Sequence, residues 1–406
     1  MNLPKLRFQG FNEPWKKIRF GDIFFEKVMK TGDIDKYPLY SLTVEKGVTP
    51  KTDRYTRDFL VKKDSNYKLV ESNDFVFNPM NMTIGALALY EGKETITVSG
   101  YYNVFSNTSA YNNTFLDTYL KTNRMINVYK SIATGSLIEK QRVHYSQFKD
   151  LKQLMPSVRE ANKISVFFSL VNRRIKKQQE KVELLKEQKK ALMQKIFSRE
   201  LRFKNEDGKE YAEWGSKCLK ELGEFKKSYT FSRALEGNGD YHHLHYGDIH
   251  VKYEGILGSE VHFPNISVEG PLETLEDNDV IFADASEDYK DLGKAVVVCG
   301  ITNKKVVAGL HTHRFSPNEL IDSRFLMYFT KTKEYGKFIR KYGTGVSVLG
   351  LSKASLSNLK VPLPSLNEQV KIAEFLFKMD KKINYLNIKL KTLEEQKKGY
   401  MQQMFI

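Results

Sequence analysis

The stretch PSVREANKISVFF, residues 156–168, returns in outline as PSLNEQVKIAEFL, residues 364–376. The two copies begin 208 residues apart, about half of the 406-residue chain. Ordered matches at such an offset indicate two copies of one unit, and the period is far too long for a solenoid. Other pairs keep the same order: ESNDFVF (71–77) with EDNDVIF (276–282), EQKKALMQ (187–194) with EQKKGYMQ (395–402), and LRF (6–8) with LRF (201–203), each LRF followed by a tryptophan.

Each copy of the stretch begins a long helix. Ser157 and Ser365 follow prolines, and Glu160 and Glu368 lie three residues later, which predicts capping boxes at two helix starts. Apolar residues then recur at alternating steps of three and four over about six heptads, which predicts a coiled-coil seam and makes an ordinary amphipathic helix packed on its own domain the less favoured alternative. The seam positions expected to pack between helices or on a partner are Ile164, Phe168, Val171, Ile175, Leu185, Leu192, Ile372, Leu376, Ile383, Leu390 and Leu393.

The two helices are expected to pack on each other. Each covers about 40 residues, or roughly 60 Å, and an apolar seam of that length is not stable in water. A pseudo-twofold axis between the copies would make the pair antiparallel. Lys189 and Lys397 occupy equivalent seam positions. They either fix the register of the pair or extend their ammonium groups to solvent, and the second interpretation is favoured.

The remaining segments predict mixed strands and short helices. Strands are expected at 74–77, 86–90, 279–282 and 294–299. We predict an α+β fold in which two α/β domains, related by a pseudo-twofold axis, are separated by two long antiparallel coiled-coil helices. The predicted boundaries are 1–155 for the first domain, 156–199 for the first helix, 200–213 for a linker, 214–362 for the second domain and 363–406 for the second helix.

Composition narrows the classes of partner and compartment. The chain has 65 Lys and Arg against 49 Asp and Glu, a formal charge of +16, which favours a polyanionic partner such as nucleic acid. Cys218 and Cys299 show no metal-binding spacing and fit a reducing compartment. The sequence has no apolar signal core and no apolar run of membrane-spanning length. A soluble cytoplasmic protein is therefore expected.

Catalytic and metal-binding motifs are weak in this chain. No G-x-x-x-x-G-K-[ST] phosphate loop occurs. NPMN (78–81) follows a predicted strand, where amino-methyltransferases carry Asn-Pro-Pro-aromatic, but it lacks the aromatic ring that would stack on a flipped base, so we expect a strand-ending turn. The histidine-rich YHHLHYGDIH (241–250) lacks thiols, and we predict surface or DNA-facing imidazoles and no metal.

The two-unit pattern resembles the specificity (S) subunit of type I restriction–modification enzymes. PSLNEQVKIAEFL matches that family's signature closely, whereas PSVREANKISVFF carries Ala161 and Asn162 where Gln and an apolar residue are usual. DFVFNPMN (74–81) and YGTGVSVLGLS (342–352) resemble segments of its target-recognition domains. The likeness covers nearly the whole chain but does not specify which bases are read.

The resemblance implies a non-catalytic subunit of a larger complex. Each target-recognition domain would read one part of a split, asymmetric sequence in double-stranded DNA, and the helix pair would space the two domains. Two methyltransferase (modification) subunits would dock on the helices and methylate adenine N6, and restriction/translocase subunits would then join. No cofactor is expected in this chain; S-adenosylmethionine, ATP and Mg are expected on the partner subunits. Two alternatives stay open: a coiled-coil scaffold that binds proteins and not DNA, and a self-contained methyltransferase–restriction fusion.

Candidate DNA-binding residues come from comparing the two copies. After the matched Gly100 and Gly309, the copies differ in polar side chains that are predicted to face a groove, with drifted surface residues as an equally weighted alternative. A basic loop supplies a second group, and small residues with free N–H groups for phosphate supply a third. The first group is Tyr101, Tyr102, Asn103, His311, His313 and Arg314; the second is Arg54, Tyr55 and Arg57, with Lys252 and Tyr253 as the weaker counterpart; the third is Thr134, Gly135, Ser136, Thr344 and Gly345.

Overall fold

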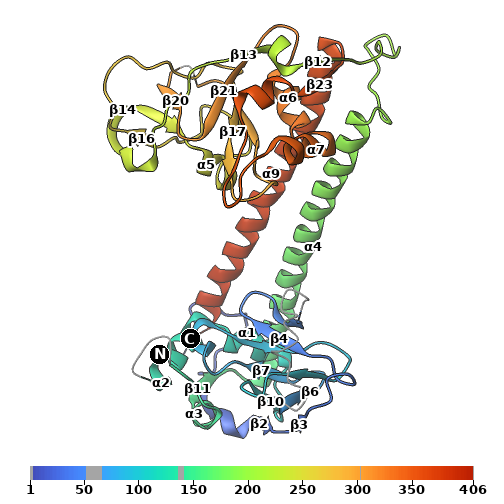
Figure 1. Ribbon diagram of the computed structural model, residues 1–406. Helices are drawn as coiled ribbons and strands as arrows, with labels where there is room; N and C mark the ends of the chain where they lie inside the picture. The colour runs from blue at the N-terminus through green and yellow to red at the C-terminus, as the bar shows by residue number, and fades with distance from the viewer. Residues whose placement is uncertain (1–2, 52–65, 136–140, 302, 406) are drawn as a thin grey trace. The chain divides into compact units, whose positions relative to one another are not determined.

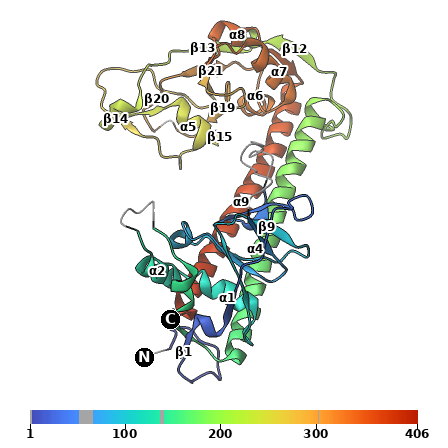
Figure 2. The same ribbon diagram turned by 60° about the horizontal axis from the view of Figure 1, so that its bottom comes forward.

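The computed structural model describes residues 3–51, 66–135, 141–301 and 303–405. The chain folds into two compact units (Figures 1 and 2). Unit 1 comprises residues 1–180 and 388–406, and unit 2 comprises residues 181–387. Each unit therefore contains one part of helix α4 (Val158–Phe197) and one part of helix α9 (Leu366–Met404). Within the described ranges, no helix combines the length and the apolar character needed to cross a membrane.

The parts of α4 and α9 run antiparallel in both units. In unit 1 the ring of Phe168 packs against Phe405 with centroids 5.7 Å apart, while further along α4 the Gln179 amide donates to Glu394 at 3.4 Å. In unit 2 Ile196 shares a hydrophobic core with Ile372, and Lys189 forms an ion pair with Asp380. As residue numbers rise along α4, those of its neighbours on α9 fall. The predicted α+β fold with two long antiparallel helices is confirmed.

The predicted seam positions are all withdrawn from solvent to some degree. The buried ones are Ile164, Phe168, Ile175, Ile372, Leu376 and Leu393, and the half-buried ones are Val171, Leu185, Leu192, Ile383 and Leu390. Lys189 departs from the expectation that it reaches solvent. Its side chain is 12% exposed and its ammonium is held by Asp380. This lysine therefore fixes a contact between the helices.

Unit 1 is built around an antiparallel four-stranded sheet in the order β2-β10-β7-β8. The rings of Phe24, Phe75, Phe105 and Phe148 fill the core beneath it. The elements of unit 1 are β1 (Lys16–Arg19), β2 (Phe24–Lys27), β3 (Lys30–Thr31), β4 (Tyr40–Thr43), β5 (Gly47–Pro50), β6 (Tyr67–Val70), β7 (Phe75–Phe77), β8 (Leu87–Leu89), β9 (Ile96–Val98), β10 (Asn103–Asn107), α1 (Asn113–Leu120), α2 (Asn123–Ile132), α3 (Tyr145–Lys149) and β11 (Lys152–Met155).

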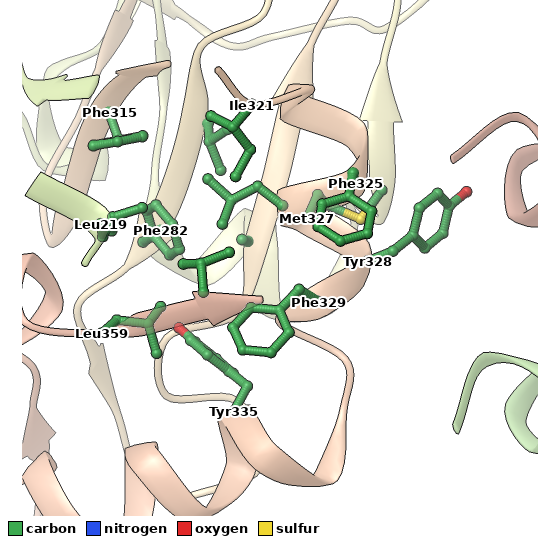
Figure 3. Packing of buried hydrophobic residues seen from close by; sticks show 14 of the residues in the cluster. Leu219, Phe282, Phe315, Ile321, Phe325, Met327, Tyr328, Phe329, Tyr335 and Leu359 are labelled. Carbon is green, nitrogen blue, oxygen red and sulfur yellow. The ribbon is translucent and has the colours of Figure 1, made fainter. Parts of the chain in front are cut away.

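Unit 2 repeats this sheet and extends it by a parallel edge strand, in the order β13-β21-β17-β19-β15. Phe282 from the sheet packs with Phe325 and Phe329 of α6 in the core (Figure 3). The elements of unit 2 are β12 (Gly215–Cys218), β13 (Gly223–Phe225), β14 (Glu236–Leu244), α5 (Tyr246–Val251), β15 (Gly255–Leu257), β16 (Asn265–Ile266), β17 (Val280–Ala283), β18 (Ala285–Ser286), β19 (Ala295–Val298), β20 (Val306–Ala308), β21 (Thr312–Pro317), α6 (Ser323–Phe329), α7 (Lys333–Tyr342), β22 (Leu349–Gly350), α8 (Lys353–Ser357) and β23 (Lys360–Leu363).

Both long helices begin with the same buried contact. The Glu160 carboxylate accepts hydrogen bonds from Trp15 Nε1 at 3.2 Å and Arg7 Nε at 2.7 Å. The Glu368 carboxylate accepts from Trp214 Nε1 at 3.0 Å and Arg202 Nη2 at 3.3 Å. These contacts explain why LRF and a tryptophan recur together in the sequence. We call them the glutamate clamps.

Each predicted capping box forms only one of its two hydrogen bonds, the one to the serine hydroxyl. The hydroxyl oxygens of Ser157 and Ser365 accept from the backbone N–H groups of Glu160 and Glu368 at 3.3 and 3.4 Å. The carboxylates do not complete the box, because they turn instead toward tryptophan and arginine. A charge-assisted bond from a guanidinium is stronger than one from a neutral backbone amide, which accounts for the difference.

Removal of one clamp should destabilise its own unit. In Glu368→Ala, the Arg202 guanidinium, whose side chain is 14% exposed, and the Trp214 indole lose a buried acceptor. We expect the free energy of unfolding of unit 2 to fall by about 3 kcal/mol. Urea denaturation followed by tryptophan fluorescence measures this change. Glu395→Ala, an exposed position on the same helix, is the matched control; an equal effect of both substitutions would contradict the clamp.

Candidate nucleic-acid interface

A surface hollow of about 650 Å³ in unit 2 brings together three of the predicted residues, His311, His313 and Thr344. The two histidines lie just before and on β21, and the threonine follows α7. Asp284, between β17 and β18, completes one wall. Sheet pairing places these segments next to one another, because β21 pairs with β17 and β22 pairs with β18.

Asp284 organises this hollow. Its Oδ1 lies 3.1 Å from His311 Nδ1, and its backbone N–H donates to the His311 carbonyl at 3.0 Å. Because a carboxylate can only accept, Nδ1 of His311 carries the proton in this contact. The other ring nitrogen, Nε2, is left for a ligand, and in the neutral ring it is an acceptor. The His311 side chain is 48% exposed, so its ring is partly open to solvent.

His313 is turned inward and supports the loop rather than reaching outward. Its Nε2 lies 2.8 Å from the Leu351 carbonyl oxygen and donates to it, and its side chain is 12% exposed. Burial lowers the pKa of His313, although Asp284 acts in the opposite direction. Burial therefore favours the uncharged ring, which ties β21 to the segment that follows β22.

The loop after α7 has a counterpart in unit 1. Thr344 and Gly350 exchange two backbone hydrogen bonds at 3.1 and 2.7 Å, and Thr134 and Arg142 exchange two at 2.9 and 2.8 Å. Both loops continue with a glycine of positive φ, 138° at Gly345 and 124° at Gly135. A Cβ at Gly345 would collide with the Val348 carbonyl, so this turn requires glycine. These four predicted residues, Thr134, Gly135, Thr344 and Gly345, are exposed, as a phosphate contact requires.

The candidate residues of unit 1 lie near the start of β10. Tyr101 is 81% exposed, whereas Tyr102 and Asn103 are half-buried. NPMN forms the predicted turn after β7: Asn78 accepts from the Met80 N–H through its side chain at 3.0 Å and from the Asn81 N–H through its carbonyl at 3.1 Å. An exposed Tyr101 ring offers stacking or groove contact, and the position that matches it in unit 2 by strand register holds the smaller and more polar ring of His311.

Two of the residues predicted to contact DNA, Arg314 and Tyr253, are buried and not exposed toward a groove as expected. Arg314 is 3% exposed, and its Nε donates to Asp279 Oδ2 at 2.6 Å. Its counterpart by strand register, Val104, is also fully buried, because β21 and β10 pair in the same way with β17 and β7. Tyr253 is buried with its hydroxyl donated to the His262 carbonyl at 2.6 Å. Exposed Lys252 stays a prediction. Arg54, Tyr55, Arg57 and Ser136 lie outside the described residues.

Sequence comparison missed Asp284, the residue that orders the hollow. Asp284 belongs to ADAS (283–286), which stands at the end of β17 where unit 1 has NPMN after β7. One feature of the sequence could have indicated Asp284: it is an aspartate that directly follows a buried strand. Polar residues at such strand ends lie in loops, where binding residues are common.

The histidine-rich stretch has structural partners. His245 is the N-cap of α5 and accepts from the Gly247 N–H at 3.0 Å, and burial lowers the pKa of its ring. His243 Nε2 lies 3.2 Å from Glu236 Oε1. Across the residues that the structure describes, no three His, Cys, Asp or Glu side chains gather as metal ligands.

Similarity to known proteins agrees with this geometry. Residues 211–395 match the type I restriction modification DNA specificity domain. The putative type I restriction enzyme MjaX specificity subunit of Methanocaldococcus jannaschii is 24% identical over 357 residues, which cover 86% of this chain and 80% of that protein. The MjaVIII specificity subunit of the same organism is 24% identical over 407 residues, covering 95% and 90%.

Solved structures show the same fold. The type I restriction–modification S subunit from M. genitalium aligns with a TM-score of 0.58 at 15% identity, covering 100% of this chain and 99% of that one. A chain from a structure describing assembly and conformational transition of the type I R-M system aligns with a TM-score of 0.59 at 15% identity, covering 98% and 99%. These structures thus share the fold of this chain. This chain is similar to type I restriction enzyme specificity subunits over 86–95% of its length, and its residues 211–395 match the DNA specificity domain of type I restriction modification.

The neutral state of His313 predicts a pH dependence of stability. Because the pKa of this buried ring is lowered on folding, the unfolded chain takes up more protons as the pH falls from about 7 to 5, and the free energy of unfolding decreases. His313→Gln keeps a donor for the Leu351 carbonyl but cannot titrate. Its urea midpoint should therefore fall less than that of the wild type over this range. Parallel decreases in the two proteins would show that His313 is not a source of the effect.

Proposed function

We propose that this chain reads a DNA sequence in two unequal parts, one through each unit. The observation that carries the proposal is the difference between two otherwise matching strand ends. Unit 2 offers His311 held by Asp284, and unit 1 offers the exposed Tyr101 beside Asn103. Different side chains on a shared frame predict different base preferences, so the site should be asymmetric rather than palindromic.

Affinity would come from charge and from loop N–H groups. A formal charge of +16 attracts DNA phosphates independently of sequence. The exposed Thr134–Gly135 and Thr344–Gly345 loops supply backbone donors suited to phosphate oxygens. We assign base choice to His311 and Tyr101, and positioning to these loops.

We further propose that α4 and α9 space the two readers and carry the partner subunits. Exposed apolar side chains on α4, including Val166, Leu170 and Leu184, support a protein-binding surface on that helix. In this proposal two modification subunits bind the helices and transfer the methyl group to adenine N6, with S-adenosylmethionine, ATP and Mg bound on modification and restriction subunits.

Methylation mapping in cells tests this proposal. Cells that express the modification subunit with this chain should acquire N6-methyladenine in one bipartite, asymmetric motif. Palindromic or unsplit motifs would contradict two unlike readers. Two further experiments address the alternatives. DNA binding by the complex that does not weaken as the salt concentration rises would favour the coiled-coil scaffold. Photocrosslinking of S-adenosylmethionine to the isolated chain would favour the methyltransferase–restriction fusion.

His311→Ala should relax only one half of the motif. Loss of one base contact costs about 1–3 kcal/mol, so preference at that position should fall by about tenfold while the other half is unchanged. Val251→Ala, an exposed position elsewhere in unit 2, is the matched control and should leave the motif intact. Relaxation of both halves by His311→Ala, or of neither, would remove His311 from base reading.

A further inference from the structure

A cavity in unit 1 has no occupant among the described side chains. It measures about 570 Å³ and lies where the junction of α1 and α2 faces α4 and α9. Its polar walls include Lys121, Arg124, Lys397 and Lys398, while Ile175 and Phe405 give it an apolar part. Glu394 lines it as well, and Asp117, nearby on α1, is already paired with Lys121 at 2.7 Å. Positive groups therefore outnumber negative ones.

The equivalent place in unit 2 is filled by the chain itself. Lys189 corresponds to Lys397, because EQKK recurs 208 residues later. The Lys189 ammonium is bound by Asp380 and lies 5.2 Å from the centre of the Tyr328 ring. Asp380 also accepts from the Tyr328 hydroxyl at 2.7 Å. A carboxylate and a ring thus satisfy the buried lysine of unit 2.

Unit 1 lacks both of these partners. The same offset of 208 residues places Asn172 where unit 2 has Asp380, and the matched helices α1 and α6 place Thr118 where unit 2 has Tyr328. No carboxylate of the described residues lies within ion-pair distance of Lys397. Burial and the neighbouring Lys121 lower the pKa of Lys397, against the opposite effect of the carboxylates of Asp117 and Glu394. A half-buried ammonium without a partner is the arrangement that an incoming anion would relieve.

We propose, resting on the function proposed above, that this cavity receives an acidic side chain of the modification subunit. The carboxylate would pair with Lys397 as Asp380 pairs with Lys189 in unit 2. A protein side chain fits better than a bare phosphate, because the cavity combines its cations with apolar walls at Ile175, Met401 and Phe405. The two units would then bind their partners differently. In unit 1 the cavity at Lys397, which we call the socket, would accept a carboxylate from the partner, whereas in unit 2 Asp380 already pairs with Lys189.

The test measures affinity between the full-length chain and the modification subunit by titration calorimetry. Lys397→Met removes the cation, and Asn172→Asp supplies the missing carboxylate from within, as in unit 2. Both should weaken binding by about tenfold or more. Asn172→Asp should also keep or raise the melting temperature, which excludes misfolding as the cause. Lys391→Met, at an exposed site on α9, is the control and should bind as the wild type does.

Each outcome decides the proposal. Wild-type affinity in both Lys397→Met and Asn172→Asp would overturn the socket and leave the proposed function intact. Weaker DNA binding with unchanged subunit affinity would overturn it in favour of a phosphate contact. Failure of the wild-type chain itself to bind the modification subunit would overturn the socket and the proposed function together.

Discussion

Each unit depends on one buried carboxylate at the start of a long helix. Trp15 directly precedes β1, which pairs with β11, and β11 leads through Pro156 into α4. Trp214 directly precedes β12, which pairs with β23, and β23 leads through Pro364 into α9. The glutamate clamps join the tryptophan before the first strand of each unit to the start of the long helix that follows the last strand. The start of each domain is therefore fixed to that helix. A buried acceptor that holds both an indole and a guanidinium tolerates little variation in either partner.

Duplication has preserved the frame of each unit and changed what lies at its strand ends. Asp74 and Asp279 precede the matched strands β7 and β17, and each binds a cation: Lys27 in unit 1 at 2.9 Å and Arg314 in unit 2 at 2.6 Å. These pairs are structural, and they differ both in the cation, lysine or arginine, and in the strand that supplies it, β2 or β21. The residues just before β10 and β21 differ in chemistry, with Tyr101 in unit 1 and His311, held by Asp284, in unit 2. That contrast is the physical basis for assigning unlike specificities.

Regular spacing made the long helices and the central strands predictable. The seam of α4 and α9 follows a period that sequence displays directly, and the runs around Phe77 and Phe282 became the buried strands β7 and β17. The exposure of single polar residues was not predictable in this way. Arg314 alternates with His313 along β21, and its charge is buried because Asp279, just before the neighbouring strand β17, pairs with it.

Comparison of the two sequence copies predicted which residues are equivalent, but it did not predict which side chains those residues contact. Lys189 and Lys397 are equivalent in sequence, yet one is paired with Asp380 and the other faces a cavity. The difference arises from Asn172 and Thr118, residues far from Lys397 along the chain, so no local pattern around the lysine reveals it. Asp284 was missed for the same reason: its importance comes from β21, which lies beside it only after the sheet has formed.

Hydrogen exchange at the two indole N–H groups tests the clamps most directly. The chain has two tryptophans, one in each unit, so ¹⁵N-tryptophan labelling gives two indole resonances. We expect both indoles to exchange slowly, and we expect Glu160→Gln to speed exchange at Trp15 while Trp214 stays protected. Fast exchange at both indoles in the wild-type chain would contradict the buried carboxylate contact on which each unit depends.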